Sequence, residues 1–285
     1  MPVASLWAAT ASLWLASGPP MPWLAVAVAV LAAGSVALNP LLDARTVQRL
    51  GARYGQARMW GSAAFVVASV AFGVLVPATS PASMLFVYAG LLAATGVAAV
   101  LLLGRGTRPP RAAGVGPLAA LRLLRAPAFG LFFIGSVAVW TAAIGVLAFF
   151  SLRVIELGGD ARLVGIAWAV TAITEIPAML VFRRLSRRIS VERLLVIGAA
   201  IFVARSVLWS VTDTAEALVV IAGLGGPGFG LFLVGTVAYV SARAPAHLQA
   251  TAQALFAGVV FALGNIVGAV VAGVVAGALG LAAVF

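Results

Sequence analysis

Cysteine is absent from this sequence of 285 residues, and histidine occurs once, as His247. Without cysteine the chain can form neither a disulfide framework nor a thiolate metal site. A metal ion needs several ligands, and one histidine without a nearby acidic cluster supplies too few. We therefore expect no metal site.

Motifs for catalysis and for nucleotide binding are also lacking. The sequence contains no Ser/His/acid set, no phosphate-binding GxxxxGK[ST] and no dinucleotide fingerprint. We expect that the chain is not an enzyme, does not act alone as an ATP-driven pump and uses no cofactor.

Charged residues are scarce. They make up 9% of the chain, against 64% hydrophobic residues, so polar groups are too few to cover a water-soluble globule. The apolar runs approach the roughly 20 residues that a membrane-spanning helix needs, and none alternates like a barrel strand. The composition predicts an all-α polytopic protein with the lipid bilayer as a partner.

We predict about nine spans and a C-terminal stub, LAAVF. The spans are expected near 2–17, 23–42, 60–77, 82–103, 128–150, 163–182, 194–211, 217–241 and 250–277.

The basic residues are all arginine, and they gather on one side of this arrangement. When alternate loops are assigned to one side, 15 arginines share the first side, Arg153 and Arg162 lie on the other, and Arg205 lies inside a span. Positive residues are enriched in cytoplasmic loops. We therefore predict a multi-pass protein of the cell membrane, inner or plasma, with Arg-rich loops in the cytoplasm. The net charge of +11 then reflects topology, not nucleic-acid binding.

The longest polar interruption, 104–127, contains five arginines and four prolines. It predicts a cytoplasmic linker between an N-terminal bundle, 1–103, of about four spans and a C-terminal bundle, 128–285, of about five spans plus the start of another. The alternative is an ordinary basic loop with no domain meaning.

Three stretches carry recognisable motifs in a fixed order. They are NPLLDARTVQRLGARYGQARMWGSAAF (39–65), RVIELGGDARLVGIAWAVTAITEIPAMLVFRRLSRR (153–188) and PGFGLFLVGTVAYVSARAPAHLQATAQALFAGVVFALGNIVGA (227–269). They resemble the branch of the major facilitator superfamily that includes 3-phenylpropionate permeases and nucleoside:proton symporters and is related to the lactose permease. The resemblance implies two six-helix bundles, with the present spans as helices three to eleven and LAAVF beginning a twelfth. On that alignment the chain is truncated at both ends.

Two charged residues lie inside predicted spans. Glu175 is eight residues, roughly 12 Å, from Arg183, and Arg205 is 12 residues, roughly 18 Å, from Arg193. The depths differ by about one helical turn, so we expect antiparallel neighbouring helices to bring the two charges together. One hypothesis is a proton and substrate site, in which Glu175 carries a proton and Arg205 holds its charged form or binds an anionic group. The alternative is a buried ion pair that fixes helix register. The resemblance supports the first, because related symporters carry an acid in the eighth helix and an arginine in the ninth.

Other residues are candidates for lining a transport path. Trp168 is deep enough to stack on an aromatic solute or to pack in the core. Asn265 is a possible polar lining residue, and Gln253 matches a family position but also fits a solvated interfacial glutamine.

Glycines predict close helix contacts. The run GLGGPGFG, 223–230, indicates tight packing, with an unwound half-helix at a binding site as the alternative. Gly264 with Gly268, and Gly273 with Gly277, form two GxxxG pairs, which we expect to serve packing.

A loop that matches the family carries Asp43, Arg45, Gly55 and Arg58. The resemblance implies a cytoplasmic gate that is broken and remade as the bundles rock. The alternative is a basic loop with one incidental acid.

These observations predict a secondary active transporter that works by proton-coupled symport and alternating access. The expected partners are protons and a small organic solute, an aromatic acid, a nucleoside or a sugar-like molecule. The alternative from another class is a truncated membrane helix bundle that does not transport, or an interaction protein.

Overall fold

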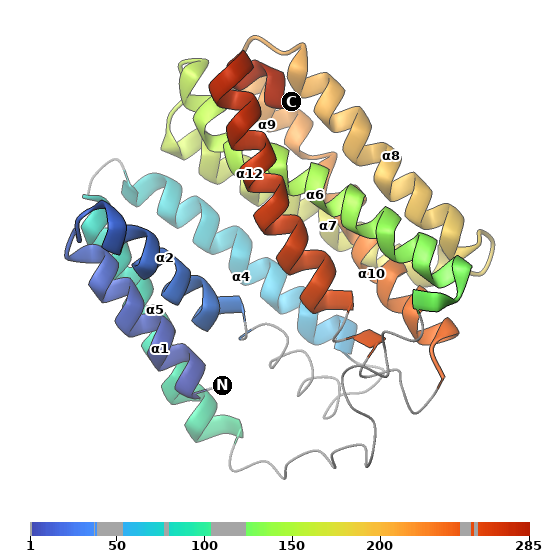
Figure 1. Cartoon of the computed structure of the whole chain (residues 1–285), viewed down its shortest axis with the longest axis horizontal. Coiled ribbons are helices and arrows are strands. Elements are labelled where there is room, and N and C mark those ends of the chain that lie inside the picture. Colours follow the sequence, from blue (N-terminus) through green and yellow to red (C-terminus); the bar gives the residue numbers. More distant parts are fainter. Residues whose placement is uncertain are drawn as a thin grey trace. The chain divides into compact units, whose positions relative to one another are not determined.

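The computed structural model describes residues 2–36, 38, 54–76, 80–103, 124–245, 252–253 and 256–285, and they are helical apart from short turns. Its helices are α1 (Pro2–Ala16), α2 (Met21–Val36), α4 (Tyr54–Leu75), α5 (Pro81–Leu103), α6 (Pro127–Glu156), α7 (Ala161–Leu185), α8 (Val191–Ser210), α9 (Ala215–Ala222), α10 (Gly225–Arg243), the π-helix η5 (Ala257–Phe261), α12 (Ala262–Leu279) and the 3-10 helix η6 (Leu281–Val284) (Figure 1).

Several of these helices suit a membrane. Within the described residues, five helices are long and apolar enough to cross one. They are Ala82–Leu101, Pro127–Glu156, Ala161–Leu185, Ala215–Arg243 and Gly258–Leu279. Shorter apolar helices cover Pro2–Ala16, Met21–Ser35 and Trp60–Leu75.

The chain divides into two compact units. Unit 1 comprises Met1–Gly61 and Ala71–Pro109, and unit 2 comprises Ser62–Val70 and Pro110–Phe285. The predicted linker falls mostly, at 104–123, outside the described residues, so its role as a linker stays a prediction.

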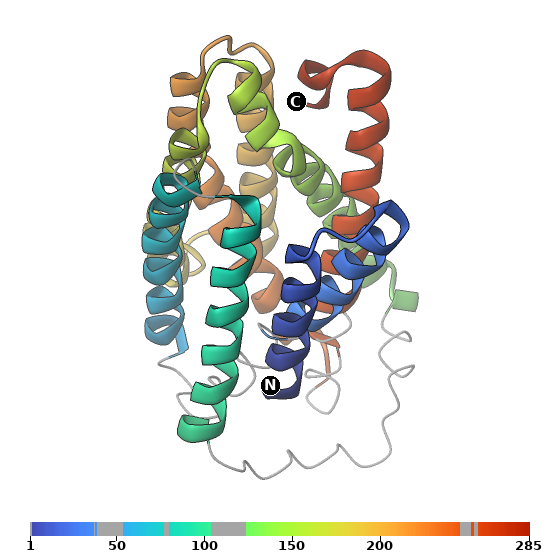
Figure 2. The same ribbon diagram turned by 90° about the vertical axis from the view of Figure 1, so that its left-hand side faces the viewer.

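Unit 1 packs through small side chains on α1. Ser5, Ala8, Ala9 and Ser12 are buried at the i, i+3, i+4 and i+7 spacing of one helix face. A Cβ built on Gly34 of α2 would lie 3.0 Å from the Ala8 Cβ. Small residues let membrane helices approach closely, and α1 packs on both α2 and α5. Figure 2 shows α1 and α5 side by side in this unit.

Hydrogen bonds between helices fix this packing in unit 1. The Ser12 hydroxyl donates to the Leu85 carbonyl of α5 at 2.9 Å, and the Trp7 indole N–H donates to the Val30 carbonyl of α2 at 3.1 Å. In each bond the acceptor is a backbone carbonyl, so the polar side chains of α1 are satisfied inside the unit without a charged partner.

Helix caps and turns set the boundaries in unit 2. Asp160 caps α7 by accepting from the Leu163 N–H at 2.9 Å, and Ser190 caps α8 by accepting from the Arg193 N–H at 3.3 Å. Gly158 adopts φ +82 in the turn before α7, a conformation that favours glycine. Pro127 occupies the first turn of α6, where its missing N–H costs no helical bond.

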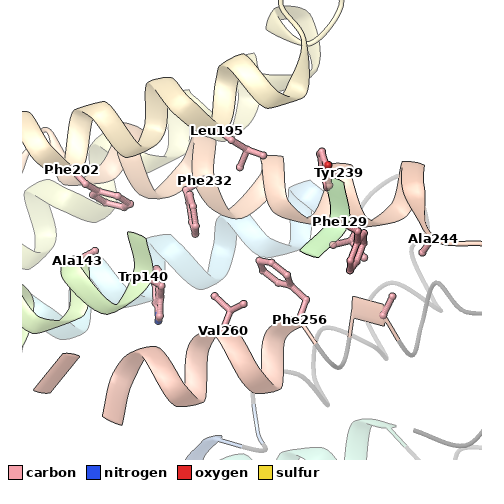
Figure 3. Close-up of a cluster of buried hydrophobic side chains, with 12 residues drawn as sticks. Phe129, Trp140, Ala143, Leu195, Phe202, Phe232, Tyr239, Ala244, Phe256 and Val260 are labelled. Atoms are coloured by element: carbon pink, nitrogen blue, oxygen red, sulfur yellow. The ribbon is translucent and has the colours of Figure 1, made fainter. Parts of the chain in front are cut away.

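The largest apolar cluster of unit 2 is aromatic. Trp140 of α6 stacks on Phe232 of α10 at 6.3 Å between centroids and meets Phe261 of η5 edge-on at 4.7 Å. Figure 3 shows the side chains of Trp140, Phe232 and Val260 pointing into this shared interior from their different helices. The cluster ties α6, α10 and η5 together.

Only the first of the two GxxxG pairs makes close contacts in this structure. A Cβ on Gly268 would collide with the Thr141 carbonyl oxygen of α6, and one on Gly264 would collide with the Trp140 ring. Near Gly273 the closest atom is Phe149 Cζ at 3.7 Å, and near Gly277 there is nothing within 4 Å. The expectation of close packing is therefore right for the first pair and wrong for the second.

We expect Gly268→Leu to destabilise the fold and Gly277→Leu to leave it almost unchanged. The first substitution forces α12 away from α6, at a cost of about 1 to 3 kcal/mol for overpacking, whereas the second enters open space. Thermal unfolding midpoints in detergent measure the difference. Equal midpoints for the two variants would contradict the assigned packing.

Candidate functional site

The site begins at a break in the helix that was predicted as one span, 217–241. The structure divides it into α9 and α10, with turn residues at Gly223 and Leu224. Pro227 explains the break, because proline has no N–H for the carbonyl four residues earlier, which belongs to Gly223, and its ring crowds that carbonyl. The predicted span agrees with the apolar stretch Ala215–Arg243, which is long enough to cross a membrane, and the turn is a local interruption of its hydrogen bonding.

Two threonines of α7 bind the carbonyls at the break. The Thr174 hydroxyl donates to the Gly223 carbonyl at 2.7 Å. The Thr171 hydroxyl lies 3.0 Å from the Ala222 carbonyl and 2.9 Å from the Ala167 carbonyl of its own helix, and its single proton is shared between them. A carbonyl without a partner is costly in hydrocarbon. The threonines therefore stabilise the broken conformation, and sequence reasoning missed them.

Glycines bring α10 against the same stretch of α7. A Cβ on Gly226 would collide with the Thr171 carbonyl, the Thr174 hydroxyl and the Glu175 N–H group. A Cβ on Gly230 would lie 3.1 Å from the Ala178 Cβ. The tight packing expected for the run 223–230 is present. The alternative, an unwound half-helix, is not seen at the turn, because Gly223 and Leu224 both keep right-handed helical dihedral angles.

Glu175 lies at this contact, on the residue after Thr174. Its side chain is 9% exposed. A buried carboxylate in a membrane helix is costly unless it is protonated or well partnered. Glu175 is thus buried, as expected for an acid inside a span, and its functional role stays a prediction.

Arg205 lies at the same break, on α8. It is 2% exposed, and its Cζ lies 4.4 Å from the Trp209 ring centroid and 5.2 Å from that of Phe202. A Cβ on Gly225 would lie 2.9 Å from Arg205 Nη1 and 3.3 Å from the Thr171 methyl carbon. A side chain added at Gly225 would displace the guanidinium and crowd the Thr171 methyl group.

The guanidinium keeps unused hydrogen-bonding capacity. Arg205 Nε and Nη2 are buried and have no hydrogen-bond acceptor within the described part of the chain. Cation–π contact offsets part of the cost of burying the charge, but it satisfies no N–H donor. These donors are available to an acceptor group that enters the site.

Glu175 and Arg205 do not form the direct pair expected from their depths. Both parent helices, α7 and α8, pack extensively on α10. Within the described residues Arg205 makes no ion pair, and its contacts are aromatic rings and the Gly225 backbone. The sequence predicts similar depths for Glu175 and Arg205, but it does not show that α10 packs against both, with Gly225 next to Arg205 and Gly226 next to Glu175.

Trp168 lies next to this region. It is half-buried and meets Phe150 edge-on at 6.3 Å, and Phe150 stacks on Trp209 at 4.7 Å. A continuous row of rings thus runs from Trp168 to the residue that carries Arg205's cation–π contact. Trp168 takes part in core packing, and its contact with solute stays a prediction.

Asn265 and Gln253 lie elsewhere in unit 2. Asn265 Oδ1 accepts from the Trp140 indole N–H at 3.3 Å, which joins α12 to α6. Gln253 Nε2 donates to the Val237 carbonyl at 2.8 Å and to the Ser241 hydroxyl at 3.1 Å. Val237 is 12 residues, about 18 Å, along α10 from Gly225. Gln253 is therefore remote from the break.

The predicted gate residues are mostly beyond what the structure describes. Asp43 and Arg45 lie outside the described residues. Gly55 and Arg58 fall within α4, but their side chains lie outside the described part. The gate stays a prediction.

Metal binding finds no support in the described part of the chain, which holds no group of three or more His, Asp, Glu or Cys side chains able to bind one ion. The arrangement at the break offers instead a buried acid, a cation with free donors, two hydroxyls and aromatic rings. Such a set can bind a polar or anionic organic group and exchange a proton.

Comparison with known proteins gives consistent matches. The MFS_1 like family matches residues 1–285. The chain is 29% identical over 252 residues to the maltose permease of Geobacillus stearothermophilus and 24% identical over 251 residues to the uncharacterized transporter YwbF of Bacillus subtilis (strain 168). Each alignment covers 86% of this chain and 61% of the relative, so the chain spans about three fifths of the length of the curated relatives it matches.

A solved structure has the same fold. A mutant of the nucleoside transporter NupG matches with a TM-score of 0.77 and 19% identity, covering 96% of this chain and 75% of that chain. The predicted all-α, major facilitator-like fold is confirmed. The relatives are named as a permease and as transporters, in agreement with the prediction that the chain is not an enzyme.

We expect Thr174→Val to lower the free energy of unfolding by about 1 kcal/mol, because it leaves the Gly223 carbonyl without its donor. Thr95→Val is the matched control, since the Thr95 hydroxyl donates only to Leu91 of its own helix and is exposed. Unfolding midpoints in detergent compare the two variants. A Thr174→Val midpoint no lower than that of the control would show that the bond at the break does not stabilise the fold.

Proposed function

We propose that this chain, which belongs to the MFS_1 like family, acts in secondary transport, moving a small organic solute across the cell membrane by alternating access. One observation carries the proposal: a buried arginine with unused N–H donors lies beside an interrupted membrane helix. In transporters, binding sites are typically formed at discontinuous helices. Charged side chains inside membrane helices are costly, so those that are present usually have a function.

Glu175 is the proposed proton carrier. A carboxyl buried beside the break exchanges between an ionised and a neutral form as water and solute reach it. Proton uptake by this group would then accompany solute binding, which is the basis of symport. Its position one residue from Thr174 supports the role, because Thr174 binds the Gly223 carbonyl, so a movement of the break would shift the backbone next to Glu175.

Arg205 is the proposed solute-binding cation. Its free Nε and Nη2 donors fit a carboxylate or a pair of hydroxyl oxygens. The neighbouring rings of Phe202 and Trp209 suit the apolar part of an aromatic acid, a nucleoside or a sugar. The names of the maltose permease and the nucleoside transporter support a solute of this kind.

Further predicted residues complete the proposal. Trp168, Asn265 and Gln253 are retained as candidate path-lining residues and the loop at Asp43 as a candidate gate. The Arg-rich helix ends are placed in the cytoplasm, in accord with the excess of arginine in those loops.

We expect Glu175→Gln to abolish solute-dependent proton flux in liposomes, because the amide cannot carry a proton. Wild type is tested with a panel of aromatic acids, nucleosides and sugars, and the flux is read with a pH-sensitive dye. Glu216→Gln is the matched control, since Glu216 is exposed in the first turn of α9. Coupled flux that survives in Glu175→Gln would rule out this role, and no flux from folded wild type would favour the bundle that does not transport.

We expect Arg205→Gln to weaken solute binding, while Arg162→Gln, an exposed position in α7, leaves it unchanged. A hydrogen bond to a charged group contributes about 1.5 to 3 kcal/mol, so the loss is roughly tenfold to a hundredfold. Titration calorimetry with the solute that supports the greatest flux measures it. Unchanged affinity in Arg205→Gln would remove the cation from the binding site.

A further inference from the structure

Arg205 presents one edge of its guanidinium to an incoming group. Phe202 and Trp209 lie one helical turn before and after it on α8, and their ring centroids lie 5.2 Å and 4.4 Å from its Cζ. Because this spacing places the three side chains on one helix face, the rings flank the cation along the helix. Nη1 lies against the backbone of Gly225 on α10. The edge with Nε and Nη2 remains, and both atoms are buried with no acceptor among the described residues.

The free edge has the geometry that binds a carboxylate. Nη2 is the terminal nitrogen on the same side as the Nε–H, so these two nitrogens form one fork of coplanar, parallel donors. The two oxygens of a carboxylate accept both hydrogen bonds at once, and the opposite charges strengthen them. Two hydroxyl groups of a sugar can also accept both bonds, but they bring no charge.

Charge balance decides between a carboxylate and a neutral solute. Glu175 and Arg205 are the only charged side chains that are buried in the described part of the chain. When Glu175 is ionised, the two charges cancel, whereas protonation of Glu175 leaves the buried cation uncompensated. An uncompensated charge inside a membrane protein is costly. A carboxylate that enters together with the proton restores a net charge of zero, and a neutral sugar or nucleoside does not.

We infer that the solute of this site is a monocarboxylate, bound edge-on by Nε and Nη2 of Arg205 and carried together with one proton on Glu175. The inference rests on the proposed function, since it requires Glu175 to exchange a proton during transport. The empty site holds ionised Glu175 and the Arg205 cation. The loaded site holds protonated Glu175, the same cation and the solute carboxylate. Neither form has a net charge, so each cycle moves one anion with one proton and transport is electroneutral.

Matched solutes test this substrate class. Proteoliposomes that contain the whole chain receive three pairs, benzoate and benzamide, glucuronate and glucose, and uridine 5′-carboxylate and uridine, with protein-free vesicles as background. We expect the transported skeleton to half-saturate uptake at a roughly tenfold to hundredfold lower concentration as the carboxylate, because it gains hydrogen bonds between charged groups. Uptake of the neutral forms alone, abolished by Glu175→Gln, would overturn the inference and leave the proposed function standing. No uptake of any solute would overturn both.

The electrical behaviour of transport is an independent test. With valinomycin, a potassium gradient of about tenfold makes the vesicle interior negative and raises the limiting accumulation of a neutral solute carried with one proton by about tenfold. We expect the accumulation of a carboxylate carried with one proton to stay unchanged. A rise in carboxylate accumulation would show that positive charge moves in each cycle and would contradict the inference. Electroneutral uptake of a neutral solute that requires chloride would overturn it in favour of an inorganic anion.

Arg205→Lys separates the fork from the charge. Lysine keeps the positive charge but has no coplanar pair of donors, so we expect carboxylate affinity to fall by about tenfold while transport stays electroneutral. Arg205→Gln removes the charge and should abolish the preference for the carboxylate. Arg162→Lys, at an exposed position of α7, is the matched control and should transport like wild type. A carboxylate preference that persists in folded Arg205→Gln would overturn the inference.

Unfolding midpoints in detergent show which variants are folded. The solute pairs and the electrical test are measured on the wild-type chain, so they decide the question even where an Arg205 variant does not fold.

Discussion

The hydrogen bonds from Thr171 and Thr174 to the carbonyls of Ala222 and Gly223 are the interactions on which the arrangement of unit 2 depends. Pro227 forces the helix to break, and the bilayer provides no water for the carbonyls that are released. Only a donor from a neighbouring helix can satisfy them. That requirement brings α7 and α10 together, and the bare backbone of Gly226 makes the approach possible.

The position of Arg205 follows from the same contact. Gly225 leaves room for the guanidinium at the start of α10, and Trp209 and Phe202 hold it through their ring faces. If Arg205 served only to fix the register of the helices, its charge would be best stabilised by an acceptor group within the protein. Two of its donor atoms are instead buried with no acceptor among the described residues, which leaves binding capacity in a place where burial is expensive. This unused capacity is what supports the proposed functional role of Arg205.

Hydropathy and charge were sufficient to predict the helical class, and the span expected near 2–17 coincides closely with Pro2–Ala16. Contacts between helices were harder to predict, because the same sequence pattern can lead to close packing in one place and to none in another. Gly264 and Gly268 lie against α6, whereas the identical spacing at Gly273 and Gly277 makes no close contact. The depth of Glu175 and Arg205 could be calculated from the sequence, but their direction around the helix axis could not. Thr171 and Thr174 carried a signal only in combination with Pro227, more than fifty residues away.

Unit 2 combines a rigid contact with a loose one, and both involve α10. Toward α7 and the C-terminal half of α8, glycines and hydrogen bonds leave little room for added side chains, and an added methyl group at Gly226 would collide with α7. Toward α6 and the first turns of α8, Phe232 and Tyr239 lie beneath an open groove. Close-packed contacts resist sliding because every displacement creates overlap or a void. The contact of α10 with α7 should therefore persist when helices of this unit move, so the break and its charges should move with α10 as one body.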